Sequence, residues 1–450
     1  MWVIAPFLTI YPLNFATLQT EFRMTGKSQK PLLPDANWDP GSPDPGKLTA
    51  KAHSARHSAG FLPDESLASD PWNWWRSQMP VTEKWAYFDH AAVAPLPRQT
   101  ADSIAGYADE AMRDGDTRWP QWAEENERLR SEFAKLLTCD PAEIALIPNT
   151  SFGINAIAEG IRWQPGDNIV LPAGEFPSNR FPWLNQRRHG VDVRVVGDEN
   201  AGEIDVESLL GAIDSRTRVV AASWVGYASG YRLDVDRMVN EVQRRGSLFF
   251  LDAIQGLGVF PLDLSRTPID FLAADGHKWL LGPEGAGVLM IREKHLSQLQ
   301  CVPVGWNSVR ASHHFSHAAF DIRPTASRYE IGSQTMVGMR ALRQSLLMFL
   351  QVREIHGERA IADRILDLTD QLIAGLNDLG ATITGSPLRD LRSGIVTFAI
   401  PNTDAVSIRR VAMEQNVVVS CRGIGVRASV HAYNNDSDIQ RLLNAIGSAR

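Results

Sequence analysis

Two short apolar runs, each ending in a polar side chain, most constrain how this chain can fold. Residues 248–251 are all apolar and lead directly to Asp252, while residues 271–274 lead into a polar cluster that contains Lys278. Short apolar runs of this kind predict buried parallel strands. Ligand-binding side chains of an open α/β sheet lie at the carboxyl ends of its strands, so we expect Asp252 and Lys278 to meet at one edge.

This pair of side chains suits pyridoxal phosphate. A lysine amine forms a Schiff base with the cofactor's aldehyde, and a carboxylate keeps the ring nitrogen protonated, so that the ring acts as an electron sink. Each residue alone has an ordinary explanation, because a lysine in a turn is usually solvated and an aspartate after a strand often forms a turn. The two residues together, within the surrounding pattern, favour a cofactor site.

The pattern D-x-x-Q at 252–255, followed by G-H-K-x-x-x-G-P-x-G-x-G at 276–287, resembles the class V aminotransferases. These fold-type-I enzymes include cysteine desulfurases, kynureninases and isopenicillin N epimerases. The resemblance spans roughly residues 85–448 and implies pyridoxal 5'-phosphate as the cofactor. It further implies a Schiff base on Lys278, a contact of Asp252 with the ring nitrogen, donation by Gln255 to the ring hydroxyl, and cofactor-binding roles for Asp275 and His277.

Short apolar strands alternate with helices between residues 144 and 275, which predicts a mostly parallel sheet covered on both faces. The resemblance implies the fold-type-I architecture, a three-layer α/β/α sandwich with a smaller C-terminal α/β domain. We expect strands at 144–147, 168–172, 191–195, 218–225, 248–251, 271–274, 287–291, 395–400 and 417–419, and helices at 98–114, 122–137, 203–214, 234–245, 336–352 and 356–379.

A chain of 450 residues has room for two domains. We expect a large cofactor-binding domain at 98–340 and a small domain at 341–450, joined by a segment at 71–97 that packs near the active site. Three tryptophans at the start of that segment mark where the chain first docks on the folded body: Trp72, Trp74 and Trp75.

The first 70 residues read as an extension outside the folded part. Residues 25–70 are rich in Pro, Gly, Ser, Lys and Asp, which predicts disorder. Residues 1–19 are apolar, yet no basic residue precedes them and Pro6 and Pro12 interrupt them, so a signal peptide or membrane anchor is disfavoured. We prefer a leader without structure, or an upstream start codon with Met24 as the true beginning.

A candidate phosphate site follows the strand at 144–147. Backbone N–H groups and hydroxyls at a helix N-terminus bind phosphate dianions, and Thr150 and Ser151 stand where such a helix begins. Serine and threonine also cap helices with no ligand present. The position upstream of Asp252 and Lys278 matches the family's cofactor-phosphate loop, so the resemblance implies that Thr150 and Ser151 bind the phosphate.

Three further positions follow from the same resemblance. Phe176 stands where family members stack a side chain on the pyridine ring, and desulfurases have histidine there. Because phenylalanine cannot transfer protons, proton transfer falls to Lys278 or another group. Tyr227 aligns with a residue that contacts the cofactor's phenolic oxygen. His90 replaces an asparagine that is typical of the family, and we expect it to pack rather than to react.

The resemblance also implies a site shared between two subunits. Residues 328–333 are similar to the family's R-x-E-x-G-T element, whose hydroxyl, here that of Ser333, reaches the phosphate of the partner subunit. The chain is then an obligate homodimer. Ser333 is also expected to cap the helix at 336–352.

The stretch from 427 to 434 resembles the family's substrate-carboxylate element, R-x-S-x-x-x-Y-N. Arg427 is the expected partner of a substrate α-carboxylate, because a planar guanidinium matches a planar carboxylate. Arg422 is a second candidate for this role.

Cysteine use separates the candidate reactions. Cysteine desulfurases have a nucleophilic cysteine between the two arginine positions, whereas residues 423–426 contain none, and Cys421 is expected to be a small buried residue. Persulfide-forming desulfuration is therefore disfavoured. Cys139, Cys301 and Cys421 show no pairing or metal-ligand spacing, which indicates a reducing, cytoplasmic compartment and no metal.

The sequence thus predicts a pyridoxal phosphate-dependent enzyme that acts on an amino acid as a transaminase or a C–S or C–N lyase. An epimerase like isopenicillin N epimerase, a cysteine desulfurase or selenocysteine lyase, and a catalytically silent regulatory protein on the same scaffold stay as alternatives. A dinucleotide-dependent dehydrogenase is a poor fit because no G-x-G-x-x-G follows an early strand. The formal net charge of −7 argues against nucleic acid as a partner, and we expect no membrane partner.

Overall fold

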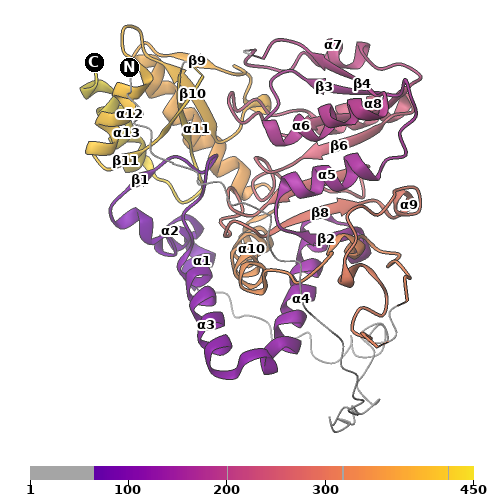
Figure 1. Cartoon of the computed structure of the whole chain (residues 1–450). Helices are drawn as coiled ribbons and strands as arrows, with labels where there is room; N and C mark the ends of the chain where they lie inside the picture. Colours follow the sequence, from indigo (N-terminus) through magenta and orange to yellow (C-terminus); the bar gives the residue numbers. More distant parts are fainter. Residues whose placement is uncertain (1–64, 200, 317–318, 424) are drawn as a thin grey trace, which may run out of the picture. The chain divides into compact units, whose positions relative to one another are not determined.

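The computed structural model describes residues 65–450 except 200, 317–318 and 424. Its largest element is a seven-stranded sheet in the order β2-β8-β7-β6-β5-β3-β4 (Figure 1). Strand β8 is antiparallel to both neighbours, and the other adjacent strands are parallel, which confirms the mostly parallel sheet. The strands are β2 (Ile144–Ile147), β3 (Asn168–Pro172), β4 (Asp192–Val196), β5 (Thr217–Ser223), β6 (Leu248–Asp252), β7 (Phe271–Asp275) and β8 (Gly287–Ile291).

Side chains of this sheet alternate between two hydrophobic cores, one on each face, because strand side chains have a period of two. Leu251 and Leu272 point into one core, whereas Phe250 and Phe271 point into the other. Helices therefore cover both faces, as the three-layer prediction requires. They include α5 (Thr150–Gly160) and α6 (Phe181–Leu184) on one face and α7 (Val206–Gly211) and α8 (Val235–Arg244) on the other.

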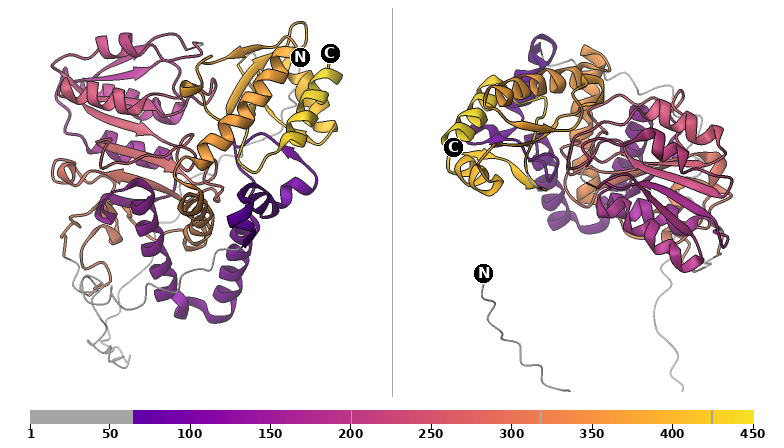
Figure 2. Two further views of the ribbon diagram at one scale, coloured as in Figure 1. Left: turned by 180° about the vertical axis from the view of Figure 1, so that it is seen from behind. Right: turned by 90° about the horizontal axis from the view of Figure 1, so that it is seen from above.

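A second, four-stranded antiparallel sheet has the order β12-β13-β10-β9. Helices α11, α12 and α13 pack with it around a separate core that contains Val396, Phe398 and Val426 (Figure 2). The elements are β9 (Thr382–Thr384), β10 (Ile395–Ala399), β12 (Ser420–Arg422), β13 (Gly425–Ser429), α11 (Ala360–Asp378), α12 (Ala405–Glu414) and α13 (Asp436–Ser448).

The segment before residue 98 joins this second core. Strand β1 (Ala86–Tyr87) pairs in parallel with β11 (Val417–Val418), and Asp89 forms a bridge with Ser429. Helix α2 (Pro71–Ser77) buries Trp74 and Trp75, and the Trp75 ring lies 4.8 Å from that of Phe349. Trp74 and Trp75 thus dock this segment, but they are not the first contact as predicted, because Leu67 of the preceding helix is already buried in the same core.

Three long helices complete the fold. Helix α10 (Met336–His356) packs against α3 (Arg98–Asp114) and α4 (Trp119–Leu137). Two further helices are short: α1 (Glu65–Ser69) and α9 (Glu293–Leu296). None of the described helices combines the length and the hydrophobicity that crossing a bilayer requires.

Most helix bounds agree with the sequence within a few residues, and the differences have local causes. Helix α10 continues to His356 and ends where Gly357 adopts a positive φ of 95°, so α11 starts later than expected, at Ala360. The predicted cap of α10 is wrong: the side chain of Thr335, not that of Ser333, accepts the N–H of Gly338 at 3.2 Å.

The expected extension falls mainly outside the described residues. This applies to the apolar run at 1–19 and to the alternative start at Met24. The last part of the extension, Glu65–Ser69, forms helix α1 and buries Leu67.

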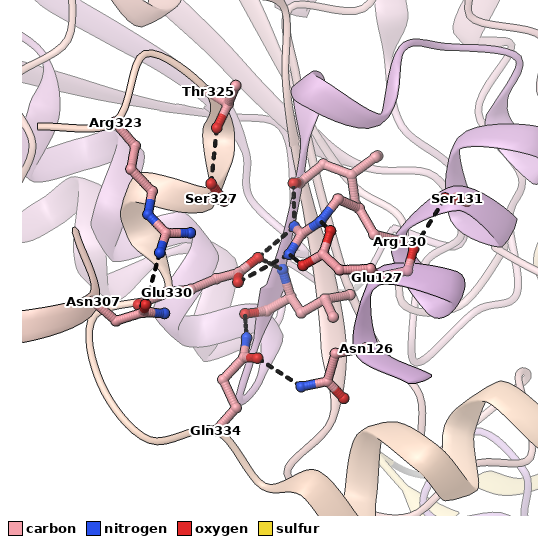
Figure 3. Close-up of polar contacts among 12 residues, drawn as sticks. Asn126, Glu127, Arg130, Ser131, Asn307, Arg323, Thr325, Ser327, Glu330 and Gln334 are labelled. Carbon is pink, nitrogen blue, oxygen red and sulfur yellow. Dashed lines mark hydrogen bonds and ion pairs between the residues drawn. The ribbon is translucent and has the colours of Figure 1, made fainter. Parts of the chain in front are cut away.

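A buried ion pair fastens the segment before Ser333 to the edge of the large sheet (Figure 3). The carboxylate of Glu330 accepts hydrogen bonds from the Arg130 guanidinium at 2.5 and 3.0 Å and from the backbone N–H of Leu146 at 2.9 Å. Glu127 contacts the same guanidinium at 2.9 Å. Since Leu146 lies in β2, this network links α4, the 328–333 segment and the strand that leads to Thr150.

Candidate active site

A cavity of about 310 Å³ opens where strand ends of the large sheet face the small sheet. Every site residue predicted from the sequence lines it except Ser333, which lies elsewhere. These residues are Thr150, Ser151, Phe176, Tyr227, Asp252, Gln255, Asp275, His277, Lys278, Arg422 and Arg427.

Strand register brings Asp252 to the cavity. Asp252 ends β6, where it pairs in register with Ser223 of β5 and with Ala273 of β7. Its side chain is buried and accepts a hydrogen bond from the backbone N–H of Ile254 at 3.1 Å. Burial raises the pKa of Asp252 to about 6, against the opposing effects of this hydrogen bond and of Lys278.

Lys278 enters the cavity from the turn after β7. Burial lowers the pKa of its amine to about 8; Asp252 opposes this shift, and Arg427 adds to it. The Nζ atom lies 5.5 Å from the ring centroid of Phe176. A lysine with a lowered pKa is partly neutral near pH 8 and is therefore nucleophilic. Asp252 and Lys278 thus line one cavity, as expected from their strand ends, and Phe176 lines it too.

The hydroxyls at the start of α5 do not cap the helix, because the side chain of Asn149 does so. The side chain of Asn149 accepts the N–H of Phe152 at 2.8 Å. The Oγ1 of Thr150 is buried and has no hydrogen-bond partner among the described residues. The Oγ of Ser151 lies 2.8 Å from that of Ser178, which also lines the cavity. The capping explanation for Thr150 and Ser151 is therefore wrong.

The amide of Gln255 is held by two neighbours. Its Nε2 donates to the carbonyl of Ala91 at 3.1 Å, and its Oε1 accepts from the Trp279 indole at 2.6 Å. An amide nitrogen has two hydrogens, so one N–H is left for a ligand. Two further lining residues contact each other: His277 Nδ1 lies 3.1 Å from Asp275 Oδ2.

The small sheet supplies the arginines. The Arg427 guanidinium lies 3.2 Å from Asp89 and donates to the Tyr227 carbonyl at 2.8 Å and to Ser420 Oγ at 3.2 Å. The side chain of Tyr227 meets the Phe176 ring edge-on, with the centroids 5.1 Å apart. Arg422 donates to the carbonyl of the adjacent Cys421 at 2.9 Å.

His90 packs behind the cavity and does not line it. Its ring nitrogens lie 2.9 Å from the Ser429 carbonyl oxygen and 2.6 Å from the Tyr433 hydroxyl. Burial lowers the pKa of His90 to about 4, so the ring is neutral at physiological pH. This is consistent with the packing role that we predicted.

Sequence reasoning missed a buried carboxyl next to the predicted stacking residue. Glu175 accepts hydrogen bonds from the backbone N–H of Ser223 at 2.7 Å, from its hydroxyl at 2.5 Å and from Asn179 at 2.9 Å. Burial raises the pKa of Glu175 to about 7, and the nearby charge of Asp252 adds to the shift. In the sequence, Glu175 was marked only by its place next to Phe176. Asp89, which pairs with Arg427 from far along the chain, was signalled only by its place in the segment 71–97 that we expected near the active site.

The residues present fit pyridoxal phosphate. The unpartnered Thr150 hydroxyl stands at a helix N-terminus, where a phosphate binds. Asp252 is a buried carboxyl whose ionised form the positive charge of a pyridinium would favour. Lys278 is a partly buried amine with a lowered pKa, and the Phe176 ring faces that amine.

Comparison with known proteins agrees with this geometry. The family model described as "Aminotransferase class-V" matches residues 86–442. A probable cysteine desulfurase of Methanothermobacter thermautotrophicus is 27% identical over 389 residues, which cover 82% of this chain and 95% of that protein. The isopenicillin N epimerase of Streptomyces clavuligerus is 28% identical over 397 residues, which cover 84% and 98%.

Solved structures share the fold. The apo cysteine desulfurase of Thermococcus onnurineus NA1 superposes with a TM-score of 0.75 at 21% identity, covering 84% of this chain and 97% of that one. A variant of C-DES with glycine covalently linked to its PLP cofactor gives 0.77 at 21% identity, covering 82% and 98%. This chain belongs to the class V aminotransferases, and it is a pyridoxal phosphate-dependent enzyme that acts on an amino acid.

Proposed function

We propose that this enzyme catalyses transamination or elimination on an α-amino acid whose carboxylate binds Arg427. The observation that supports this most directly is the placement of Arg427 and Lys278 in one cavity. The contacts of Arg427 with Asp89 and with the Tyr227 carbonyl fix the guanidinium, so its planar edge is preorganised for a carboxylate. A substrate bound there presents its Cα to the amine of Lys278.

Lys278 acts as the base at Cα in this proposal. Its lowered pKa, about 8, makes it a proton acceptor near neutral pH. Bound pyridoxal phosphate would supply the electron sink for the reaction at Cα. Phe176 has no acidic hydrogen to transfer, and we assign proton transfer at Cα to Lys278 because its amine has a lowered pKa.

The remaining lining residues hold the cofactor. Thr150 and Ser151 bind the phosphate with the N-terminal N–H groups of α5, and Asp252 pairs with the ring nitrogen. Phe176 stacks on the ring, while Gln255 and Tyr227 contact the ring hydroxyl. Asp275 and His277 support the turn that contains Lys278, since their side chains lie 3.1 Å apart at its start.

The cysteines favour these reactions over persulfide-forming desulfuration. None of the three cysteines lines the cavity. Cys421 Sγ lies 3.4 Å from the carbonyl oxygen of Ala405, and burial raises the pKa of its thiol. The thiolate is the nucleophilic form, so this cysteine is poorly suited to attack sulfur.

The working enzyme is a homodimer in this proposal. Ser333 stands outside the cavity of its own subunit, on a segment fixed by the pairing of Glu330 with Arg130. We place its hydroxyl against the cofactor phosphate of the partner subunit. The large domain comprises residues 98–340 and the small domain 341–450, and the three unpaired cysteines support a cytoplasmic location.

A panel experiment tests the reaction. The purified holoenzyme is mixed with each amino acid and with matched amines that lack the carboxylate, such as alanine against ethylamine. We expect the visible absorbance band to shift only with amino acids, and keto acid to accumulate. No shift with any amino acid would support the silent regulatory alternative. Inverted stereochemistry without keto acid would indicate an epimerase, and sulfide with alanine a desulfurase.

A further inference from the structure

Two arginines point from the same face of one hairpin into the cavity. In the β12–β13 pair, Ser420 lies opposite Arg427 and Arg422 lies opposite Gly425. Side chains two apart along a strand share a face, as do directly opposed residues. Arg422 and Arg427 are therefore diagonal neighbours, and both line the cavity.

Gly425 leaves the space beside Arg422 open. A Cβ atom at this position would lie 2.8 Å from the carbonyl oxygen of Phe398, so only glycine fits. The residue directly opposite Arg422 thus has no side chain that could cover it.

The two guanidinium groups differ in their partners. Arg427 is paired with Asp89 at 3.2 Å and with two further oxygen atoms. Arg422 contacts only the carbonyl of its neighbour Cys421, and no carboxylate of residues 65–450 outside the gaps pairs with it. A partly buried guanidinium without a counter-ion is costly, which makes the site one that favours an anion.

Other charges facing the cavity do not neutralise Arg422. Asp252 interacts with Lys278, and Asp275 lies against His277 at 3.1 Å. Burial and then repulsion from Arg422 lower the pKa of Arg427, opposed by Asp89, so the positive charge of Arg422 acts on its neighbour.

We propose that Arg422 binds a second anionic group, on the side chain of the substrate. Together with the proposed function, on which this inference rests, it defines the substrate class as α-amino acids whose short side chain ends in a carboxylate or a similar oxyanion. The side chain is short because a cavity of about 310 Å³ also has to contain the cofactor.

Matched pairs of amino acids test the proposal on the wild-type holoenzyme. L-aspartate and L-asparagine have nearly the same size and differ in charge, as do L-glutamate and L-glutamine. We expect the absorbance titration to give a dissociation constant about ten- to a hundredfold lower for the acid than for the amide in at least one pair. Equal constants within both pairs would overturn the proposal.

Variants at Arg422 give a second test, read as the acid-to-amide ratio of dissociation constants. Arg422→Gln should bring the ratio to about one, while Arg422→Lys should retain part of it, because lysine keeps the charge but not the planar fork. If Arg422→Gln weakens acid and amide equally, Arg422 shares the α-carboxylate with Arg427 and the proposal is wrong. If Arg422→Gln fails to fold, the acid-to-amide ratios of the Arg422→Lys variant and of the wild-type enzyme are compared instead.

The same titrations separate this inference from the proposed function. A response to all four amino acids without preference for the acids would overturn the inference alone. The absence of any response, with alanine included as a fifth ligand, would overturn the proposed function and this inference with it.

Discussion

The two sheets supply the cavity with charged side chains that differ in whether an opposite charge pairs with them. From the large sheet come Asp252, which is buried and placed by strand register, and Lys278, which is partly buried and placed by the turn after β7. From the small sheet come Arg427, which is held by Asp89, and Arg422, which has no carboxylate partner among the described residues. On the large-sheet side, the charge of Asp252 thus faces the opposite charge of Lys278. On the small-sheet side, Arg422 adds a positive charge that no described carboxylate balances.

This difference assigns separate tasks to the two sides. A matched, buried set suits a cofactor that stays bound through every turnover. The positive charge of Arg422 on the small-sheet side suits a negatively charged substrate, which binds and is then released. We therefore expect changes on the large-sheet side to affect all substrates, and changes on the small-sheet side to affect affinity and selectivity.

The largest effect is expected at Lys278. Lys278→Ala removes both the attachment point and the base, so turnover should fall on the order of 10³-fold or more for every amino acid. Single-turnover kinetics with the reconstituted variant measure this. If Lys278→Ala retained wild-type turnover, the large-sheet side would not be the side that every substrate depends on.

Breaking the buried ion pair should be the next largest effect. Glu330→Gln leaves the buried charge of Arg130 without its main partner, which costs roughly 3–5 kcal/mol of unfolding free energy. Denaturant unfolding measures the loss. The exposed pair of Arg128 and Glu124 is the control, since Glu124→Gln should cost less than about 1 kcal/mol. Equal costs for the two variants would contradict the structural role of Glu330.

Arg427→Lys tests the substrate side. Loss of the planar fork should raise KM about ten- to a hundredfold, while kcat falls less, because the bound carboxylate loses a charge-assisted contact. Steady-state kinetics at saturating cofactor provide both values. If kcat falls and KM does not change, Arg427 acts in the chemical step rather than in binding.

The pH dependence of cofactor attachment should show a smaller effect. Only the neutral amine attacks an aldehyde, and the pKa of Lys278 is lowered to about 8. The rate at which the apoprotein binds the cofactor covalently should thus rise with pH and level off above about 8. Asp252 raises that pKa, so Asp252→Asn should move the midpoint to lower pH. A rate that still rises toward pH 10 would show an ordinary lysine.

Much of the fold was predictable because its signals are local. Apolar runs mark β6 and β7 and place Asp252 and Lys278 at strand ends, whereas the other predicted cavity residues follow from the resemblance to the family. The cap of α10 was misassigned because Ser333 and Thr335 both precede the helix, and only the backbone shows which one reaches an N–H.

The missed contacts depend on distant parts of the chain. Asp89 meets Arg427 because β1 joins the small sheet through β11, a pairing that no local pattern encodes. Glu175 becomes a buried neighbour of Asp252 only once β5 and β6 lie side by side. For the same reason, only the folded chain shows that Arg422 has no carboxylate partner among the described residues.

Borohydride reduction of the holoenzyme followed by peptide mapping tests the central claim most directly. The account predicts that the reduced pyridoxyl group is found on the amine of Lys278 and on no other lysine. A label on another residue, or a protein that stays colourless after reconstitution with pyridoxal phosphate, would contradict it.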